Sequence, residues 1–194
     1  MIGIMKKDGN TKTLKFVKDA HAGQFHANEV PVFNHLARVA KRLEIVLRET
    51  NEGSMRERNL IVKASLGHDL IEDTTVSRKD LEKIFGKEGL ALIDGMTNTW
   101  GDENISPYVE KISSAAEEVR LIKLADLADN LTSVTYNLTV LKKEWVNSYF
   151  LPIVTPMTKA VLKTKFIKYK KSGTLLQEMV RSAFFILLDE MRRY

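Results

Sequence analysis

The sequence predicts an all-α fold. Apolar residues recur mostly every three to four positions, few alternations of β-branched residues interrupt this spacing, and the 194-residue chain has only four prolines. Its hydrophobic content of 44% is ample for a buried core in one domain. We therefore expect a helical bundle formed by residues 11–140, with a helical extension at residues 141–194 that packs on the same domain.

The first helices follow from their apolar stripes. One is expected from Thr11 to His21, and a second from about Asn34 to Glu49, with a single apolar stripe along its length. The polar segment ETNEGSMRER then interrupts the pattern. The next helix, from about Asn59 to Ile71, is apolar nearly all round, which indicates that it is buried.

The later helices are marked by caps, loops and prolines. Ser77 and Gly86 are the expected N-cap and stop of one helix, and EGLALIDGMT forms another short helix. The loop TNTWGDENISP ends where Ser106-Pro107 opens a further helix, and the buried run VRLIKLADLADNL follows it. Beyond residue 142 we expect two or three helices, with breaks at Pro152, Pro156 and Ser172-Gly173.

The composition excludes several kinds of site. Because the chain has no cysteine, it has no disulfide, thiolate nucleophile or cysteine-ligated metal centre, and any metal must sit on histidine and carboxylate. No apolar run suits a signal peptide or approaches the ~18 residues of a membrane span, so a cytoplasmic location is expected. The net charge of +5 and the pI of about 9.3 suit a nucleic-acid binder or an enzyme that acts on small polyanions.

The segment GHDLIEDT concentrates ionisable groups in an apolar stretch. It holds His68, Asp69, Glu72 and Asp73, and on a helix His68 would lie near Glu72 while Asp69 would lie near Asp73. Burying such groups is costly unless they are paired or coordinate a cation. A bound metal ion is therefore the simplest interpretation.

Two further residues have the chemistry and setting of metal ligands. A histidine and an aspartate supply only two of the roughly four protein ligands of a stable divalent site. His35 opens the amphipathic helix NHLARVAKRL, and Asp126 lies in the apolar run IKLADLADNL. Each also has a structural interpretation, because a histidine suits a helix start and Asp126 can pair with Lys123. Their combination with the HD pair is what indicates a metal site.

The order His35, His68-Asp69, Asp126 resembles that of the HD superfamily of metal-dependent phosphohydrolases. Short sequence motifs around these residues narrow the resemblance to the hydrolase domain of SpoT-like alarmone hydrolases, including the small stand-alone forms. They occur in one order from about Phe16 to Leu131: AHAGQ, HLARVA, HDLIEDT, FG, DGMT and KLADLADNL. The resemblance implies an HD-domain helical bundle. It does not extend to the residues after about 140.

The resemblance also implies roles for individual residues. It makes the four residues His35, His68, Asp69 and Asp126 ligands of a divalent metal ion, usually manganese. Glu72 and Asp73 would position or deprotonate the attacking water, although a solvated helix end is the structural alternative. Three further residues would belong to the substrate site: Asn130, which contacts sugar and phosphate; Lys123, which orients the aspartate or neutralises phosphate unless it forms a plain ion pair; and Tyr108, unless it only packs.

Four positions depart from the family pattern. After AHAGQ, alarmone hydrolases usually carry a basic pair that packs against guanine, whereas this chain has His26 and Ala27, and alanine has no plane to stack on a purine. Leu127 and Asp129 stand where the family often has a basic residue and a histidine or tyrosine. Asp129 would repel phosphate unless it faces away. The catalytic part is intact and the recognition part is altered, with His26 as the candidate base contact.

Three functions fit these observations. The first is a stand-alone, manganese-dependent hydrolase that removes pyrophosphate from the 3′ position of guanosine tetra- or pentaphosphate. The second applies the same chemistry to another phosphorylated nucleotide, such as an adenine alarmone, NADPH or a nucleoside monophosphate. The third is a non-catalytic protein whose basic C-terminal helices bind nucleic acid or a partner protein. Because a pure binder does not need a water-activating pair, a small nucleotide is the expected partner, nucleic acid and membrane are not, and oligomerisation stays open.

Overall fold

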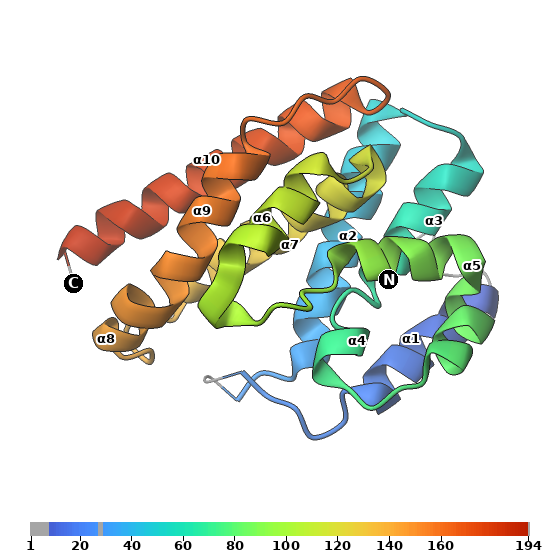
Figure 1. Ribbon diagram of the computed structural model, residues 1–194, viewed down its shortest axis with the longest axis horizontal. Coiled ribbons are helices and arrows are strands. Elements are labelled where there is room, and N and C mark those ends of the chain that lie inside the picture. The colour runs from blue at the N-terminus through green and yellow to red at the C-terminus, as the bar shows by residue number, and fades with distance from the viewer. Residues whose placement is uncertain (1–7, 27–28, 194) are drawn as a thin grey trace.

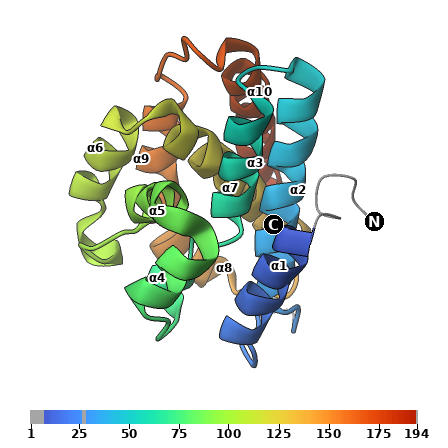
Figure 2. The same cartoon turned by 90° about the vertical axis from the view of Figure 1, so that its right-hand side faces the viewer.

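The computed structural model describes residues 8–26 and 29–193, and within them the predicted all-α fold is confirmed. No strand occurs in these ranges, although Phe25 and Pro31 form one isolated β-bridge. The helices form one bundle around a long central helix, α7 (Figures 1 and 2). The elements in chain order are α1 (Asp8–Ala20), α2 (Val32–Thr50), α3 (Met55–Ser65), α4 (Leu70–Asp73), α5 (Arg78–Met96), the 3-10 turn η1 (Asp102–Asn104), α6 (Ile105–Ser114), α7 (Glu117–Tyr136), α8 (Lys143–Trp145), the π-helical turn η2 (Val146–Phe150), α9 (Leu151–Val161) and α10 (Lys170–Arg193).

Helix α7 lies at the centre of the core because it is apolar on nearly every side. Leu121, Leu124, Ala125 and Leu131 are fully buried. The helix packs against α2 and α5 on one side and α6, α9 and α10 on the other (Figure 1). Each buried leucine contributes roughly 1.5–3 kcal/mol to stability. The same packing carries Asp126 into the interior of the bundle.

The buried helix expected from Asn59 to Ile71 begins earlier than predicted. Ser54 accepts a hydrogen bond from the backbone N–H of Glu57, and the Glu57 carboxylate accepts one from the backbone N–H of Ser54. This capping box satisfies two of the free donors at the helix start, so α3 begins at Met55. The polar segment ETNEGSMRER is therefore half helical, and prediction of a break throughout it is wrong.

The same helix also ends earlier, before the histidine–aspartate pair. Residues 66–69 form a turn between α3 and α4. In this turn the His68 ring forms a hydrogen bond with the Ser65 backbone carbonyl, and Nδ1 lies 2.7 Å from the oxygen. Gly67 packs so tightly that a Cβ would lie 2.7 Å from the Phe85 ring. His68 and Glu72 are therefore not stacked on one helix, and that prediction is wrong.

Helix α5 contains both of the helices predicted between residues 77 and 97. Ser77 caps its start as expected, and its side chain accepts a hydrogen bond from the Asp80 N–H at 3.2 Å. Gly86 interrupts the helix with a φ of +74°, a conformation that favours glycine. Because the chain resumes its helical path at once, the predicted stop is a kink within one element.

The breaks expected at Pro152, Pro156 and Ser172-Gly173 are wrong. Pro152 and Pro156 both lie within α9, and residues 143–161 are helical throughout because α8, η2 and α9 follow one another without a break. The actual break is at residues 162–169. There Glu52 and Glu117 accept backbone N–H groups from residues 167–172, which fixes the start of α10 against the bundle.

Candidate metal centre

The turn between α3 and α4 aims the His68 ring into the protein. Because the Ser65 carbonyl can only accept, His68 Nδ1 donates the hydrogen bond between them. The other ring nitrogen, Nε2, is then left as an acceptor in the neutral imidazole. The side chain is 2% exposed, and Nε2 is buried without a hydrogen-bond partner among the described residues. Such an atom is suited to binding a metal ion.

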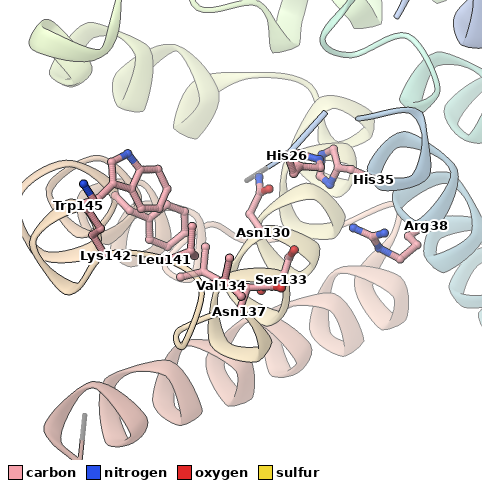
Figure 3. A pocket seen from close by; sticks show the side chains of 12 residues that line it. His26, His35, Arg38, Asn130, Ser133, Val134, Asn137, Leu141, Lys142 and Trp145 are labelled. Atoms are coloured by element: carbon pink, nitrogen blue, oxygen red, sulfur yellow. The ribbon is translucent and has the colours of Figure 1, made fainter. Parts of the chain in front are cut away.

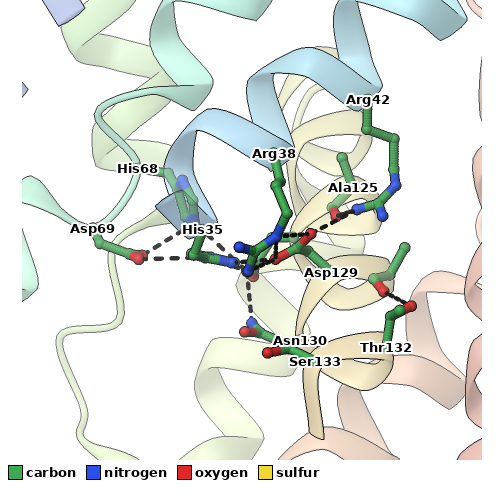
Figure 4. Close-up of polar contacts among 12 residues, drawn as sticks. His35, Arg38, Arg42, His68, Asp69, Ala125, Asp129, Asn130, Thr132 and Ser133 are labelled. Atoms are coloured by element: carbon green, nitrogen blue, oxygen red, sulfur yellow. Dashed lines mark hydrogen bonds and ion pairs between the residues drawn. The ribbon is translucent and has the colours of Figure 1, made fainter. Parts of the chain in front are cut away.

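His35, His68 and Asp126 meet at one point, although they come from α2, the 66–69 turn and α7. Asp126 Oδ1 lies 3.2 Å from His35 Nε2 and 3.5 Å from His68 Nε2. All three ligand atoms lie within 4.8 Å of one another, and all three residues are buried. Asp69 lies on the more open side, with Oδ1 3.2 Å from His68 Nε2 (Figure 4).

These distances fit a divalent ion. Ligand atoms about 2.1 Å from a shared metal lie roughly 3.0–3.4 Å apart, close to the separations seen here. Two imidazoles and two carboxylates form the mixed nitrogen and oxygen set that Mn²⁺, Fe²⁺ or Zn²⁺ accepts. The four side chains predicted as ligands are therefore brought together, and their chemistry suits the ion.

The electrostatics of the cluster favour a positive charge at its centre. Burial opposes protonation of His35, but hydrogen bonds to Asp126 and Asp129 outweigh burial and raise the pKa of His35 to about 10. The pKa of His68 is likewise raised against burial by Asp69 and Asp126. Burial raises the pKa of Asp126 less than Lys123 and the two histidines lower it, so its carboxylate stays charged. A divalent ion supplies the charge that the protons supply otherwise.

Asp126 is held in place by two neighbours on α7. Lys123 Nζ donates to Oδ2 at 2.9 Å, and Asn130 Nδ2 donates to Oδ1 at 2.7 Å. Lys123 is only 13% exposed, and its ammonium also lies 5.1 Å from the centre of the Tyr108 ring. Lys123 and Asn130 thus orient the aspartate and both line the pocket at the cluster.

Asp129 faces away from that pocket, as the sequence required if it was not to repel phosphate. Its Oδ2 accepts from His35 Nδ1 at 2.8 Å and from Arg38 Nη2 at 2.8 Å (Figure 4). Arg42 Nη1 donates to the Ala125 carbonyl at 3.1 Å and lies 3.4 Å from Asp129 Oδ1. Hydrogen bonds from His35 and Arg38 overcome burial and hold the pKa of Asp129 at about 2.

The carboxylate of Asp129 therefore fixes which nitrogen of His35 faces the cluster. With Nδ1 donating to Asp129, Nε2 is turned toward Asp126 and is free to bind a metal ion. Sequence reasoning missed this role and the two arginines. The available signal was spacing, because Arg38 and Arg42 follow His35 at intervals of three and seven residues on one helix face.

Glu72 and Asp73 lie on the open side of the cluster. Glu72 Oε1 accepts from the backbone N–H of Asn98 at 2.8 Å, which anchors it to the loop after α5. Although much of the side chain is exposed, its carboxylate is desolvated in the pocket, which raises the pKa of Glu72 to about 7. Burial and the charge of Asp69 also raise the pKa of Asp73. The Asp73 carbonyl accepts from Gln24 Nε2 at 2.8 Å, so the AHAGQ word holds this helix end.

Of the other predicted substrate residues, Tyr108 is buried and its hydroxyl donates to the Met96 carbonyl. It is packed in the core and also lines the pocket at the cluster, so its place in the substrate site stays a prediction. The His26 ring lies 6.1 Å from the His35 ring, and burial and the charge of His35 lower the pKa of His26, so it is neutral at neutral pH. Ala27 lies outside the described residues.

Two hollows that share lining residues border the cluster. One, of about 360 Å³, contains Asp69, Glu72, Asp73 and Lys123. The other, of about 530 Å³, runs along α7 toward Trp145 (Figure 3). His26, His35 and Asn130 line both hollows. A molecule that reaches the cluster can therefore extend into the larger hollow.

Comparisons with known proteins agree with this geometry. Residues 13–138 match the family model of the HD domain. The chain is 34% identical over 112 residues to the guanosine-3′,5′-bis(diphosphate) 3′-pyrophosphohydrolase MESH1 of Drosophila melanogaster, with 56% of this chain and 59% of that protein covered. It is 33% identical over 141 residues to a probable guanosine-3′,5′-bis(diphosphate) 3′-pyrophosphohydrolase of Mycoplasma pneumoniae, covering 65% of this chain and 18% of that protein.

The fold is shared with a solved structure. That solved structure is described as a metazoan ortholog of SpoT that hydrolyzes ppGpp. It matches this chain with a TM-score of 0.70, and the match covers 92% of this chain and 95% of that one. At 23% sequence identity, this match shows the fold alone. The chain spans less than two thirds of the two curated relatives named above.

Proposed function

Since the chain belongs to the HD-domain family, we propose that it is a metal-dependent phosphohydrolase that removes pyrophosphate from the 3′ position of guanosine tetra- or pentaphosphate. The observation that carries the proposal is the meeting of His35, His68 and Asp126, with Asp69 and Glu72 on the open side of the same pocket. The similarity to 3′-pyrophosphohydrolases supports the choice of substrate.

The metal would be held by His35, His68, Asp69 and Asp126. A divalent ion held there would lower the pKa of a water molecule and would polarise a phosphoryl oxygen of the substrate. We propose manganese among the divalent ions because the ligands combine imidazole nitrogen with carboxylate oxygen, and Mn²⁺ accepts both kinds of donor atom. The open side at Asp69 leaves room for both water and phosphate.

Glu72 would take the proton from the attacking water. A general base works best when its pKa lies near the operating pH, and desolvation raises the pKa of Glu72 to about 7. The hydrogen bond from Asn98 fixes the carboxylate on the pocket wall. Asp73, one residue on and held through its carbonyl by Gln24, would orient the same water.

Lys123 and Asn130 would serve the phosphate. Lys123 stays charged because Asp126 raises its pKa against the cost of burial, and both residues line the pocket. A fixed cation beside the reacting phosphorus stabilises the negative charge that develops there. Both side chains are held in place by their hydrogen bonds to Asp126.

A second candidate keeps this chemistry and changes the nucleotide. It is favoured by one observation, that His26 lies on the pocket wall where alarmone hydrolases usually carry a charged basic side chain. An adenine alarmone, NADPH or a nucleoside monophosphate would then be the substrate. The non-catalytic alternative is less well supported, because Lys168 of the basic C-terminal region is paired with Glu57 and Glu118.

A location in the cytoplasm belongs to the same proposal. None of the helices in the described part of the chain is long and apolar enough to cross a bilayer. An enzyme of this kind would meet its nucleotide there.

The test is product release from a panel of guanine and adenine alarmones, NADPH and nucleoside monophosphates, with manganese present and Glu72→Gln as the blank. We expect pyrophosphate and guanosine diphosphate from guanosine tetraphosphate, and release that is about 10²–10⁴-fold slower by the blank. Turnover of a different nucleotide would replace the first candidate by the second. No turnover by protein shown to contain bound metal would contradict both.

A further inference from the structure

The larger hollow has the size and lining of a nucleoside site. Its volume is about 530 Å³, within the range of small-molecule pockets. Figure 3 shows Trp145 and Leu141 on one side, Arg38 on the other, and polar side chains of α7 between them. The rings of Trp145 and Phe150 stack with centres 5.8 Å apart and form an apolar wall. A flat, partly apolar group with polar edges suits this space.

Arg38 is the cation on the wall nearest the metal cluster. It lies one helical turn after His35 on α2, and its side chain is 44% exposed. The guanidinium is held by three hydrogen bonds to Asp129, from Nε at 3.0 and 3.1 Å and from Nη2 at 2.8 Å. An exposed arginine is normally mobile, whereas this one is fixed at the rim of the hollow.

The pairing with Asp129 leaves Arg38 able to contact a ligand. The three bonds use the edge formed by Nε and Nη2, so the faces of the guanidinium plane are not committed to the carboxylate. A fixed guanidinium plane stacks on a purine ring, which a lysine ammonium cannot do. Asp129 also contacts Arg42, so one carboxylate serves two guanidinium groups and does not fully offset their charge.

We propose that Arg38, held by Asp129, is a substrate-positioning residue that stacks on the purine base of a nucleotide whose phosphates reach the metal cluster. His35 lines both hollows and bonds to the same Asp129 oxygen as Arg38, which places the base site directly beside the cluster. The inference rests on the proposed function only in taking the substrate to be a nucleotide.

The experiment measures binding without turnover. The chain has two tryptophans, so Trp100→Phe leaves Trp145, which lines the hollow, as the single fluorescent reporter. In that background, guanosine diphosphate and adenosine diphosphate are titrated against the manganese-loaded protein, and inorganic pyrophosphate serves as a probe without a base. We expect both nucleotides to change the Trp145 emission on binding.

Arg38→Ala should raise the Kd for both nucleotides by roughly tenfold or more, since stacking on one base contributes about 1–3 kcal/mol. Binding of pyrophosphate should be unchanged. Arg38→Lys should not restore nucleotide affinity, because it keeps the charge and loses the plane. Arg42→Ala is the matched control, since it removes another guanidinium from Asp129 and does not line the hollow.

Several results would overturn the inference. These are failure of either nucleotide to bind, equal losses in Arg38→Ala and Arg42→Ala, and rescue by Arg38→Lys. In the hydrolysis assay, Arg38→Ala should raise KM and leave kcat nearly unchanged. An unchanged KM for guanosine tetraphosphate would refute the role of Arg38 while leaving the proposed function standing. Nucleotide binding that depends on Arg38, in protein that does not hydrolyse guanosine tetraphosphate, would support the role of Arg38 and contradict the proposed function.

Discussion

The metal cluster and the larger hollow beside it are built in opposite ways. The cluster buries charged side chains at its centre, and two of its residues, His68 and Asp69, come from one short segment. The hollow is lined largely by apolar and amide groups spread from Asn130 to Phe150, with Arg38 added from α2. The chemistry of the site is therefore concentrated in a few short words of sequence. Recognition is dispersed over surfaces that only the fold brings together.

The largest expected effect lies at the centre of the cluster. Asp126→Asn should abolish metal binding and turnover, because this carboxylate contacts His35, His68 and Lys123. It also leaves the Lys123 ammonium buried without its counter-ion, which costs about 3–5 kcal/mol of folding stability. Bound manganese per chain and the thermal midpoint measure the two effects.

A second substitution separates these two effects. Adding Lys123→Met to Asp126→Asn should recover part of the lost stability, because the unpaired charge is removed. It should not restore manganese binding. If the double variant regained one ion per chain, Asp126 would not be a ligand.

A large effect on rate alone is expected one step outside the ligands. Glu72→Gln should lower kcat by about 10²–10⁴-fold while manganese content stays at the wild-type level. The wild-type rate should fall as pH drops through about 7, because desolvation raises the pKa of Glu72 to that value and only the ionised carboxylate can take a proton. The residual rate of Glu72→Gln should lack this limb of the profile.

Glu88→Gln is the matched control for Glu72→Gln. Glu88 is an exposed glutamate paired with Arg56 on the outside of the bundle. It should leave both rate and pH profile unchanged. A Glu72→Gln variant with the wild-type profile would remove Glu72 from the reaction.

A smaller effect is expected behind the cluster, at Asp129. Asp129→Asn should weaken manganese affinity by about 10–100-fold, because the carboxylate that orients His35 through Nδ1 is lost. Isothermal titration with manganese measures the change directly. Asp94→Asn, which disrupts an exposed pair with Arg78, is the control. Equal affinities in the two variants would show that His35 needs no support from Asp129.

The smallest effect on function is expected in the C-terminal helices. Gly173→Ala should lower stability by about 1–3 kcal/mol, because its Cβ would overlap the Phe166 ring. For a chain of this size that is a fall of roughly 2–4 °C in Tm per kcal/mol. Thr174→Ala, at the exposed neighbouring position, should change Tm little. Turnover by the folded Gly173→Ala protein should be normal, and a specific loss of turnover would tie α10 to the active site.

Local rules predicted much of the fold. The apolar stripe of α2 and the apolar run of α7 identify these helices, because the spacing of their apolar residues follows the faces that are buried. Ser77 was identified as the cap of α5 because its side chain can accept a hydrogen bond from a free backbone N–H. The predictions failed where tertiary contacts override propensity. The turn at 66–69 depends on the packing of Gly67 against Phe85, which no local pattern records. Pro152 and Pro156 were misread because proline usually ends or kinks a helix, whereas here both lie within α9.

The site shows the same division. His35, His68 and Asp126 could be selected from the sequence because residue type and order limit what they do. Asp129 could be identified as an anomaly but not as the partner of His35, since its direction depends on how α2 crosses α7. The spacing of Arg38 from His35 placed the two residues on one helix face, but only the fold places the Arg38 guanidinium at the rim of the hollow.

The most direct test of the central claim is to strip the protein of metal and titrate manganese back while following pyrophosphate release from guanosine tetraphosphate. The account predicts no release by the stripped protein, and a rate that rises in proportion to bound manganese until the site formed by His35, His68, Asp69 and Asp126 is filled. Release that does not depend on the ion, or a filled site that releases no pyrophosphate, would contradict it.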